Sequence, residues 1–375
     1  MNIALVGCGF VADYYLATLP LHPELAVRGI FDRRPERAQA LAQRYGVPAY
    51  ASLDALRGDA SVQMVLNLTN PDQHFEISRA MLEAGKHVYS EKPLAMEMEQ
   101  ASELIALAAQ RGLTIACAPC SLLGETAQTM IRALRNGAVG PVRVVYAEMD
   151  DGLVHRMAYR QWTSVSGVPW PYEDEFEVGC TLEHAGYCVS WLAAMFGPAR
   201  RVVSFASVQV PDKLPGPPRP NQGADFSVAC IEFANGVAAR LTCSILAPHD
   251  HKLTVIGDDG ILYTHDSWDY RSPVYRRRWL TIRRRTLLSP LRERIRLPPP
   301  PHGRPRTQGA QKMGFARGPA ELAASIREGR ACRLSPAFSL HVNEIALAIH
   351  HARRDGAARE MSTTFELPQP MPWMA

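Results

Sequence analysis

The chain has 375 residues, of which 47 % are hydrophobic and 21 % charged, and its formal charge at pH 7 is +4. This composition is typical of a globular protein of about two domains and excludes a disordered, collagenous or coiled-coil protein. No apolar run reaches the roughly 18 residues of a membrane-spanning helix, the N-terminus lacks the basic start of a secretion signal, and the eight cysteines have no regular spacing, so we expect a cytoplasmic protein with reduced thiols.

Five short apolar runs alternate with helical patterns over the first 120 residues. The runs cover 3–6, 25–31, 62–68, 87–89 and 113–118, and helical spacing falls over 35–45, 74–84 and 97–110. Alternating strands and helices favour a doubly wound parallel sheet. We therefore predict an α/β fold with one domain over residues 1–120 and a second over residues 121–375.

A glycine-rich turn follows the first apolar run. Gly7-x-Gly9-x-x-Ala12 matches the dinucleotide-binding fingerprint of a Rossmann domain, with alanine at the third position. Gly7 permits the tight turn, Gly9 lets a pyrophosphate approach the backbone, and Ala12 keeps the helix close to the strand. We expect the intervening Phe10 and Val11 to contribute to the same cofactor site.

The end of the second apolar run bears on the choice of cofactor. Asp32 lies 23 residues after Gly9, where an acid accepts the ribose hydroxyls of NAD and repels the 2′-phosphate of NADP. Arg33 and Arg34 follow it, and either could bind that phosphate or lie in a solvated face. NAD is the expected cofactor, and NADP remains possible.

The second half of the chain is rich in predicted strands. Strand-like runs cover 202–210, 226–233, 237–244 and 253–256, and helical patterns cover 319–328 and 340–353. Asn235-Gly236 between two of the runs is a strong hairpin signal. These patterns predict an antiparallel sheet in the second domain.

A basic insert occupies residues 270–307. From Arg271 to Arg306 there are twelve arginines and one acid, Glu293, a local charge of +11 that leaves −7 for the remaining residues. Such a segment attracts polyanions. No helix-turn-helix, zinc-finger or RNA-recognition motif occurs, so nucleic acid is not expected. An anionic membrane surface, an acidic partner and a sheet edge packed on an acidic neighbouring subunit stay open as alternatives.

Two further motifs stand in register with the first domain's elements: Thr69-Asn70-Pro71 with His74, and Gly85-Lys86-His87-Val88 followed by Glu91-Lys92-Pro93. Together they closely resemble the Gfo/Idh/MocA oxidoreductases, the family of glucose–fructose oxidoreductase and inositol dehydrogenase. The resemblance implies a Rossmann domain followed by an α/β domain with a large, mostly antiparallel open sheet, and hence a homo-oligomer (dimer or tetramer) formed through that sheet. It also implies cofactor contacts by Thr69, Asn70, Pro71, His74, Glu91, Lys92 and Pro93.

Lys92 is the predicted catalytic lysine of this motif. An ammonium beside a nicotinamide can donate to a substrate oxygen and stabilise the alkoxide-like charge that develops during hydride transfer. Pro93 restricts the residue before it to extended geometry, and Glu91 can hold or tune the ammonium. A lysine outside such a motif is usually a solvated side chain.

Residues 179–188 resemble the family's helix-opening segment, which carries an Asp two residues before a Gly and a His two residues after it. Aligned on Gly186, this chain has His184 in the Asp position and Cys188 in the His position. Imidazole titrates near neutrality, so His184 is the predicted acid/base, with Glu183 and Tyr187 as weaker candidates. Cys188 is either a substrate contact or a small buried residue.

An aromatic and acidic stretch lies upstream of that helix. Trp162 and the segment 170–177 combine rings and carboxylates, as carbohydrate sites do, although a solvated acidic loop explains the pattern nearly as well. We include Trp162 among the predicted substrate contacts. No metal is expected, because Asp150-Asp151-Gly152 starts no calcium loop and Cys117-x-x-Cys120 has no ligand partners at zinc spacing.

These features together predict an NAD(P)-dependent oxidoreductase acting on a hydroxyl or ketone of a sugar, cyclitol or nucleotide sugar, with Lys92 polarising the oxygen and His184 moving the proton. One alternative is an NAD-dependent glycosidase that oxidises a sugar carbon transiently, with no net redox change. Another is a catalytically inactive dinucleotide-binding regulatory protein. The substrate's identity and stereochemistry lie beyond the sequence.

Overall fold

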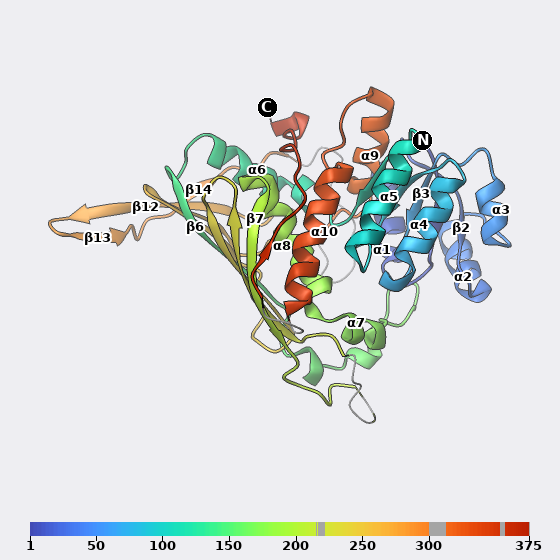
Figure 1. Ribbon diagram of the computed structural model, residues 1–375, viewed down its shortest axis with the longest axis horizontal. Coiled ribbons are helices and arrows are strands. Elements are labelled where there is room, and N and C mark those ends of the chain that lie inside the picture. Colours follow the sequence, from blue (N-terminus) through green and yellow to red (C-terminus); the bar gives the residue numbers. More distant parts are fainter. Residues whose placement is uncertain (215, 217–221, 300–312, 353–356, 375) are drawn as a thin grey trace.

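The first part of the chain folds into a parallel five-stranded sheet. A computed structural model describes residues 1–374 except 215, 217–221, 300–312 and 353–356 (Figure 1). The sheet order is β2-β1-β3-β4-β5, and this confirms the predicted doubly wound arrangement. The strands are β1 (Asn2–Val6), β2 (Ala26–Phe31), β3 (Met64–Asn67), β4 (His87–Ser90) and β5 (Ile115–Cys117). The helices are α1 (Ala12–Thr18), α2 (Pro35–Tyr45), α3 (Leu53–Gly58), α4 (His74–Glu83) and α5 (Met98–Gln110).

Helices cover both faces of this sheet, as its near-continuous apolar strands require. Ile3 and Leu5 of β1 belong to a core that includes Tyr15 of α1, whereas Ala4 belongs to a core that includes Leu104 of α5. Because the strands are parallel, their carboxyl ends share one edge of the sheet, where ligands of such folds bind. The turns after β1 to β4 bring the predicted cofactor residues to that edge.

The second part is built around a ten-stranded, mostly antiparallel sheet, as predicted. Its order is β13-β12-β11-β10-β6-β9-β8-β7-β15, with β14 paired to β12 and a single parallel pair, β6 with β9. The strands are β6 (Val142–Asp150), β7 (Ala199–Ser207), β8 (Phe226–Phe233), β9 (Ala238–Ser244), β10 (Leu253–Gly257), β11 (Gly260–Thr264), β12 (Val274–Ile282), β13 (Arg285–Leu288), β14 (Glu293–Ile295) and β15 (Arg359–Glu360).

The described residues of the second part also form five helices: α6 (Glu125–Arg135), α7 (Tyr172–Val178), α8 (Cys180–Phe196), α9 (Arg317–Glu328) and α10 (Pro336–His350). Helices α6, α8 and α10 pack on the large sheet, α7 packs on α8, and α9 contacts β4 of the first part (Figure 1). Of these, α8 contacts β9, and α10 contacts β7 of this sheet as well as α5 and β5 of the first part. Since α10 packs on both parts, the domain division at residue 120 stays a prediction. None of the described helices combines the length and apolar character needed to cross a bilayer.

The bounds of β7 differ from the predicted ones. The sequence places this strand over 202–210, but β7 begins and ends three residues earlier. The amides of Gln209 and Val210 donate to the Asp225 carboxylate at 2.7 and 2.9 Å, so they are not available to a neighbouring strand. A side-chain acceptor therefore ends the strand that the apolar pattern alone would prolong.

The basic insert forms part of the sheet and then leaves it. β12 pairs first with β11 and, further along, with β13, and the β12–β13 hairpin extends beyond the body of the molecule (Figure 1). Arg276 binds Glu293, and Arg292 lies over the ring of Tyr275 at 4.6 Å from its centroid. The final part of the predicted insert, 300–307, lies outside the described residues.

Candidate active site

The turn after β1 has the form that the dinucleotide fingerprint requires. Gly7 has a φ of +97°, and a Cβ added to it would lie 2.5 Å from the carbonyl oxygen of Leu68. Only glycine fits both the conformation and the contact. A Cβ on Gly9 would meet nothing within 4 Å, so the backbone there is open to a ligand. Ala12 is buried at the start of α1, while Phe10 and Val11 are half-buried beside the turn.

Asp32 at the end of β2 is fixed against this turn. Its two carboxylate oxygens accept the amides of Cys8 and Arg34, each at 2.8 Å. Each oxygen keeps acceptor capacity for a hydroxyl, while the side chains of Arg33 and Arg34 are exposed. The residues at this edge therefore fit a dinucleotide: the Gly7–Gly9 turn would hold its pyrophosphate and Asp32 its ribose hydroxyls. A bound nicotinamide dinucleotide supplies hydride-transfer chemistry.

His74 joins the turns that follow β3 and β4. The ring is fully buried, and its two nitrogens lie 2.6 Å from the carbonyl oxygen of Pro93 and 2.9 Å from that of Thr69. The structure thus gives His74 a positioning contact on both turns. In the turn after β3, Pro71 is half-buried and Asn70 is exposed. The Asn70 side chain donates to Asp174 of α7 at 2.7 Å, so this turn also contacts the second part of the chain.

Glu91 positions the backbone before Lys92. One of its carboxylate oxygens accepts the hydroxyl of Tyr15 at 2.6 Å, and the other accepts the Lys92 amide at 3.0 Å. Both oxygens are therefore engaged by groups other than the Lys92 ammonium. Glu91 is buried, so it fixes the direction in which Lys92 leaves the end of β4.

The Lys92 ammonium donates to Glu183 of α8. Burial, the largest single effect, would lower the pKa of Lys92, but the negative charge of Glu183 and smaller contributions from its other neighbours together outweigh it, so the pKa is raised. Burial would likewise raise the pKa of Glu183, yet the ammonium holds it below its usual range. The side chains keep 15 % and 13 % exposure. The pair is thus an ion pair that still reaches the surface of the protein.

Glu175 of α7 is the third ionisable residue of this group, beside Lys92 and Glu183. Glu183 and the Trp170 side chain both act on the pKa of its carboxyl. Burial, reinforced by the negative charge of Glu183, raises the pKa of Glu175 well above its usual range, so Glu175 is the neutral acid of the two. Trp170 in turn contacts Trp162, whose ring centroid lies 5.0 Å away; Trp162 is exposed and one ring removed from the carboxyl pair.

The first turn of α8 places the weaker candidate Glu183 against Lys92. Glu183, rather than His184, meets Lys92, and Tyr187 lies on the same face one turn later. The Lys92 charge acts on the Tyr187 hydroxyl, although burial, the larger effect, raises the pKa of Tyr187. Cys188 is fully buried near Ser267, and burial raises the pKa of its thiol to about 12. Cys188 therefore offers a substrate neither open surface nor a thiolate.

His184 belongs to a second group of side chains beside the first. Its Nε2 lies 2.8 Å from Asp151 Oδ2, and the Nε2 of His251 lies 2.7 Å from Asp151 Oδ1. Burial would raise the pKa of Asp151, but the two imidazoles hold it below its usual range. The Nδ1 of His184 has no hydrogen-bond partner. The indole ring of Trp268 lies 5.6 Å from the His184 ring and 4.5 Å from the His251 ring.

Sequence reasoning missed Glu175, Asp151, His251 and Trp268. Two signals were available: the acidic pair Asp150-Asp151 at a strand end, and the carboxylates within 170–177. Neither signal indicates which side chains these residues contact, because their partners lie in distant segments; His251 and Asp151, for example, are 100 residues apart.

Comparison with known proteins places these observations in a family. Residues 1–118 match the family model described as "Oxidoreductase family, NAD-binding Rossmann fold", and residues 127–263 match the GFO/IDH/MocA C-terminal domain. The trans-1,2-dihydrobenzene-1,2-diol dehydrogenase of Mus musculus is 26 % identical over 269 residues, which cover 70 % of this chain and 74 % of that protein. The corresponding enzyme of Oryctolagus cuniculus is 28 % identical over 262 residues, covering 68 % and 73 %.

Solved structures share the fold at low identity. A levoglucosan dehydrogenase in complex with NADH and levoglucosan superposes with a TM-score of 0.77 at 19 % identity, covering 96 % of this chain and 99 % of that one. A 3-ketoreductase from Actinomadura kijaniata in complex with TDP-benzene and NADP has a TM-score of 0.71 at 21 % identity, covering 93 % and 96 %. The chain therefore belongs to the GFO/IDH/MocA oxidoreductases and carries their NAD-binding Rossmann domain.

Proposed function

We propose that this oxidoreductase transfers a hydride between nicotinamide and a hydroxyl or ketone carbon of a sugar, a cyclitol or a nucleotide sugar. The observation that carries the proposal is the Lys92–Glu183 ion pair, which lies after β4 at the same sheet edge as the Gly7–Gly9 turn. An ammonium kept charged at that edge stabilises a substrate oxygen as negative charge develops on it. The dehydrogenases and the ketoreductase that resemble this chain support the substrate class.

His184 is the group we assign to the proton. Asp151 accepts from its Nε2 and so leaves the lone pair on Nδ1, a buried nitrogen with no other partner. This is the way a carboxylate orients an imidazole base in other enzymes. In the oxidising direction, Nδ1 accepts the hydroxyl proton while Lys92 donates to the oxygen. Glu183 keeps the ammonium charged, and the neutral Glu175 supports Glu183.

A turnover panel tests the proposed function. Purified protein is incubated with NAD⁺ and separate sugars, cyclitols and nucleotide sugars, while reduced nucleotide and released aglycone are measured in parallel. One reduced nucleotide formed per oxidised substrate is the expected result. Release of an aglycone with no net reduced nucleotide would identify the glycosidase alternative instead. Nucleotide binding without either product would favour a regulatory protein.

Asp32→Ala is expected to weaken NADH binding by about 10- to 100-fold, because a charged acceptor of hydroxyl hydrogen bonds contributes about 1.5–3 kcal/mol. NADPH binding should weaken far less, since the repulsion of its 2′-phosphate is removed as well. Fluorescence titration of the native protein and the variant with NADH and NADPH measures the ratio of the two affinities. Asp54→Ala, an exposed acid on α3, is the matched control. Unchanged NADH affinity in Asp32→Ala would contradict the assignment of the adenosine end.

We also propose that the chain forms a homo-oligomer through the open face of the large sheet and the β12–β13 hairpin. Val203 and Phe205 on that face are 45 % and 55 % exposed, and Ile282 near the hairpin tip is 59 % exposed. The arginine-rich segment and the acidic remainder of the chain are complementary in charge. Light scattering should give the mass of a dimer or a tetramer. The mass of a single chain would contradict the proposed oligomer, and an anionic membrane surface or another acidic partner would then be the expected ligand of the hairpin.

We place the protein in the cytoplasm, a proposal supported by the eight free cysteines, of which seven are buried.

A further inference from the structure

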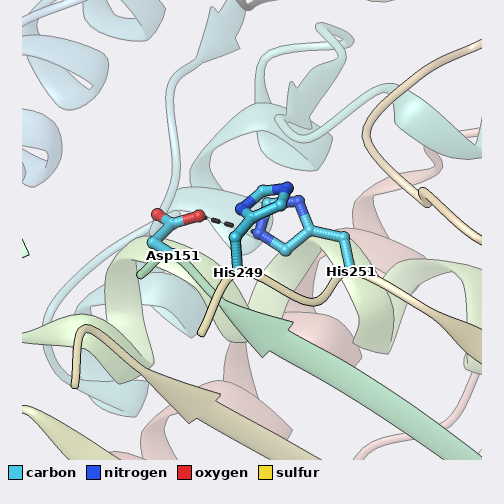
Figure 2. Close-up of side chains that lie close together, drawn as sticks. All are labelled: Asp151, His249 and His251. Atoms are coloured by element: carbon cyan, nitrogen blue, oxygen red, sulfur yellow. Dashed lines mark hydrogen bonds and ion pairs between the residues drawn. The ribbon is translucent and has the colours of Figure 1, made fainter. Parts of the chain in front are cut away.

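Three potential metal ligands meet where β6 and β10 lie side by side. Asp151 follows β6, and His249 and His251 precede β10. The backbone groups of Asp150 and Asp250 exchange hydrogen bonds at 3.0 and 2.9 Å, so this pairing brings the two segments together. One ligand atom from each of Asp151, His249 and His251 lies within 4.8 Å of the other two. Figure 2 shows the two imidazole rings beside each other and next to the carboxylate; their centroids are 4.2 Å apart and their planes are tilted by 57°.

A further side chain lies behind two of the three ligands: His184 behind Asp151, and Asp266 behind His251. The second carboxylate oxygen of Asp151 accepts from His184 at 2.8 Å. On the far side of the His251 ring, Nδ1 lies 3.8 Å from Asp266 Oδ1, and the amides of Trp268 and Asp269 donate to that same oxygen. A carboxylate behind a histidine is the usual second partner of a metal-bound imidazole, because it fixes the ring and the tautomer.

We propose that Asp151, His249 and His251 bind a divalent transition-metal ion of the Zn²⁺ class. Two imidazole nitrogens and one carboxylate oxygen suit Zn²⁺ and its neighbours, whereas Ca²⁺ and Mg²⁺ prefer oxygen ligands alone. The inference departs from the sequence prediction of no metal and does not depend on the proposed hydride transfer. Binding uses the Nε2 lone pair of His251, so the ring proton moves from the Asp151 side to Nδ1, toward Asp266.

The ion would lie beside the candidate active site. Asp151 links it to His184, which is adjacent in sequence to the Lys92 partner Glu183. Three protein ligands leave at least one coordination position for water or a substrate oxygen, as in catalytic zinc sites. His251 is a buried ligand, whereas His249 is exposed. An ion can therefore reach the site from the surface on the His249 side.

Co²⁺ titration tests the site directly. Full-length protein is stripped with a chelator and titrated with Co²⁺, whose visible absorption bands report the number and type of ligands. One equivalent should bind and be displaced by Zn²⁺. His249→Ala and His251→Ala should abolish stoichiometric binding, and Asp266→Asn should lower the affinity by about 10-fold through the outer shell.

His265→Ala is the matched control, because His265 is exposed and lies outside the three-residue cluster. It should bind Co²⁺ like the native protein. Circular dichroism shows which variants are folded. Because His249 is exposed, His249→Ala is the variant least expected to disturb folding. Absence of ligand bands in the native protein, or equal bands in the native protein and folded His249→Ala, would overturn the proposal.

Discussion

Lys92→Ala is expected to lower kcat by about 10³-fold, the upper range for removing one donor that stabilises a developing oxyanion. The affinity for NADH should change little, because Asp32 and the Gly7–Gly9 turn lie after other strands. Steady-state kinetics on a substrate from the turnover panel, combined with NADH fluorescence titration, separates the two effects. The loss should appear in kcat rather than in the nucleotide Kd.

Lys92→Met and an unrelated cation provide the controls for this prediction. Methionine keeps the apolar length of the side chain and removes only the charge, so Lys92→Met should lose as much activity as Lys92→Ala. Arg57→Met, on the exposed surface of α3, should behave like the native protein. Equal losses of turnover and nucleotide affinity in both Lys92 variants would mean that Lys92 mainly holds the fold or the nucleotide.

Glu183→Gln should lower kcat by about 10²-fold and change its pH dependence. In the native protein burial acts to lower the pKa of Lys92, and Glu183 is the largest of the contributions that together reverse this effect. Without the carboxylate the pKa of Lys92 falls, so the ammonium loses its proton at a lower pH than in the native protein. The alkaline limb of the kcat profile should therefore move to lower pH, whereas the Kd of the nucleotide should stay close to that of the native protein.

A pH–rate series of Glu183→Gln and Glu183→Asp measures this effect. The aspartate variant keeps the negative charge and should recover part of both the rate and the native alkaline limb. Glu76→Gln, an exposed acid on α4, is the control for a change of charge elsewhere. An alkaline limb that stays in place in Glu183→Gln would show that Glu183 does not maintain the Lys92 ammonium.

The sequence determined the elements whose signals are local. The bounds of α2 (Pro35–Tyr45) and β8 (Phe226–Phe233) are those predicted, because apolar spacing and flanking residues within one segment define them. The same holds for the Gly7–Gly9 turn, whose glycine spacing after a strand is a local signal, although the contact with Leu68 that also requires glycine at Gly7 is a tertiary one. The Glu91-Lys92-Pro93 motif located the lysine by resemblance alone.

Only the tertiary structure decided which side chains meet. Lys92 and Glu183 are 91 residues apart, and a helix turns its side chains by 100° for each residue, so the spacing along the chain does not say which residue of α8 contacts Lys92. The contacts of Asp151 with His184 and His251 depend on how β6 pairs with β10 and how α8 crosses the sheet. Such contacts are fixed by packing between distant segments, and the spacing of residues along the chain carries no record of them.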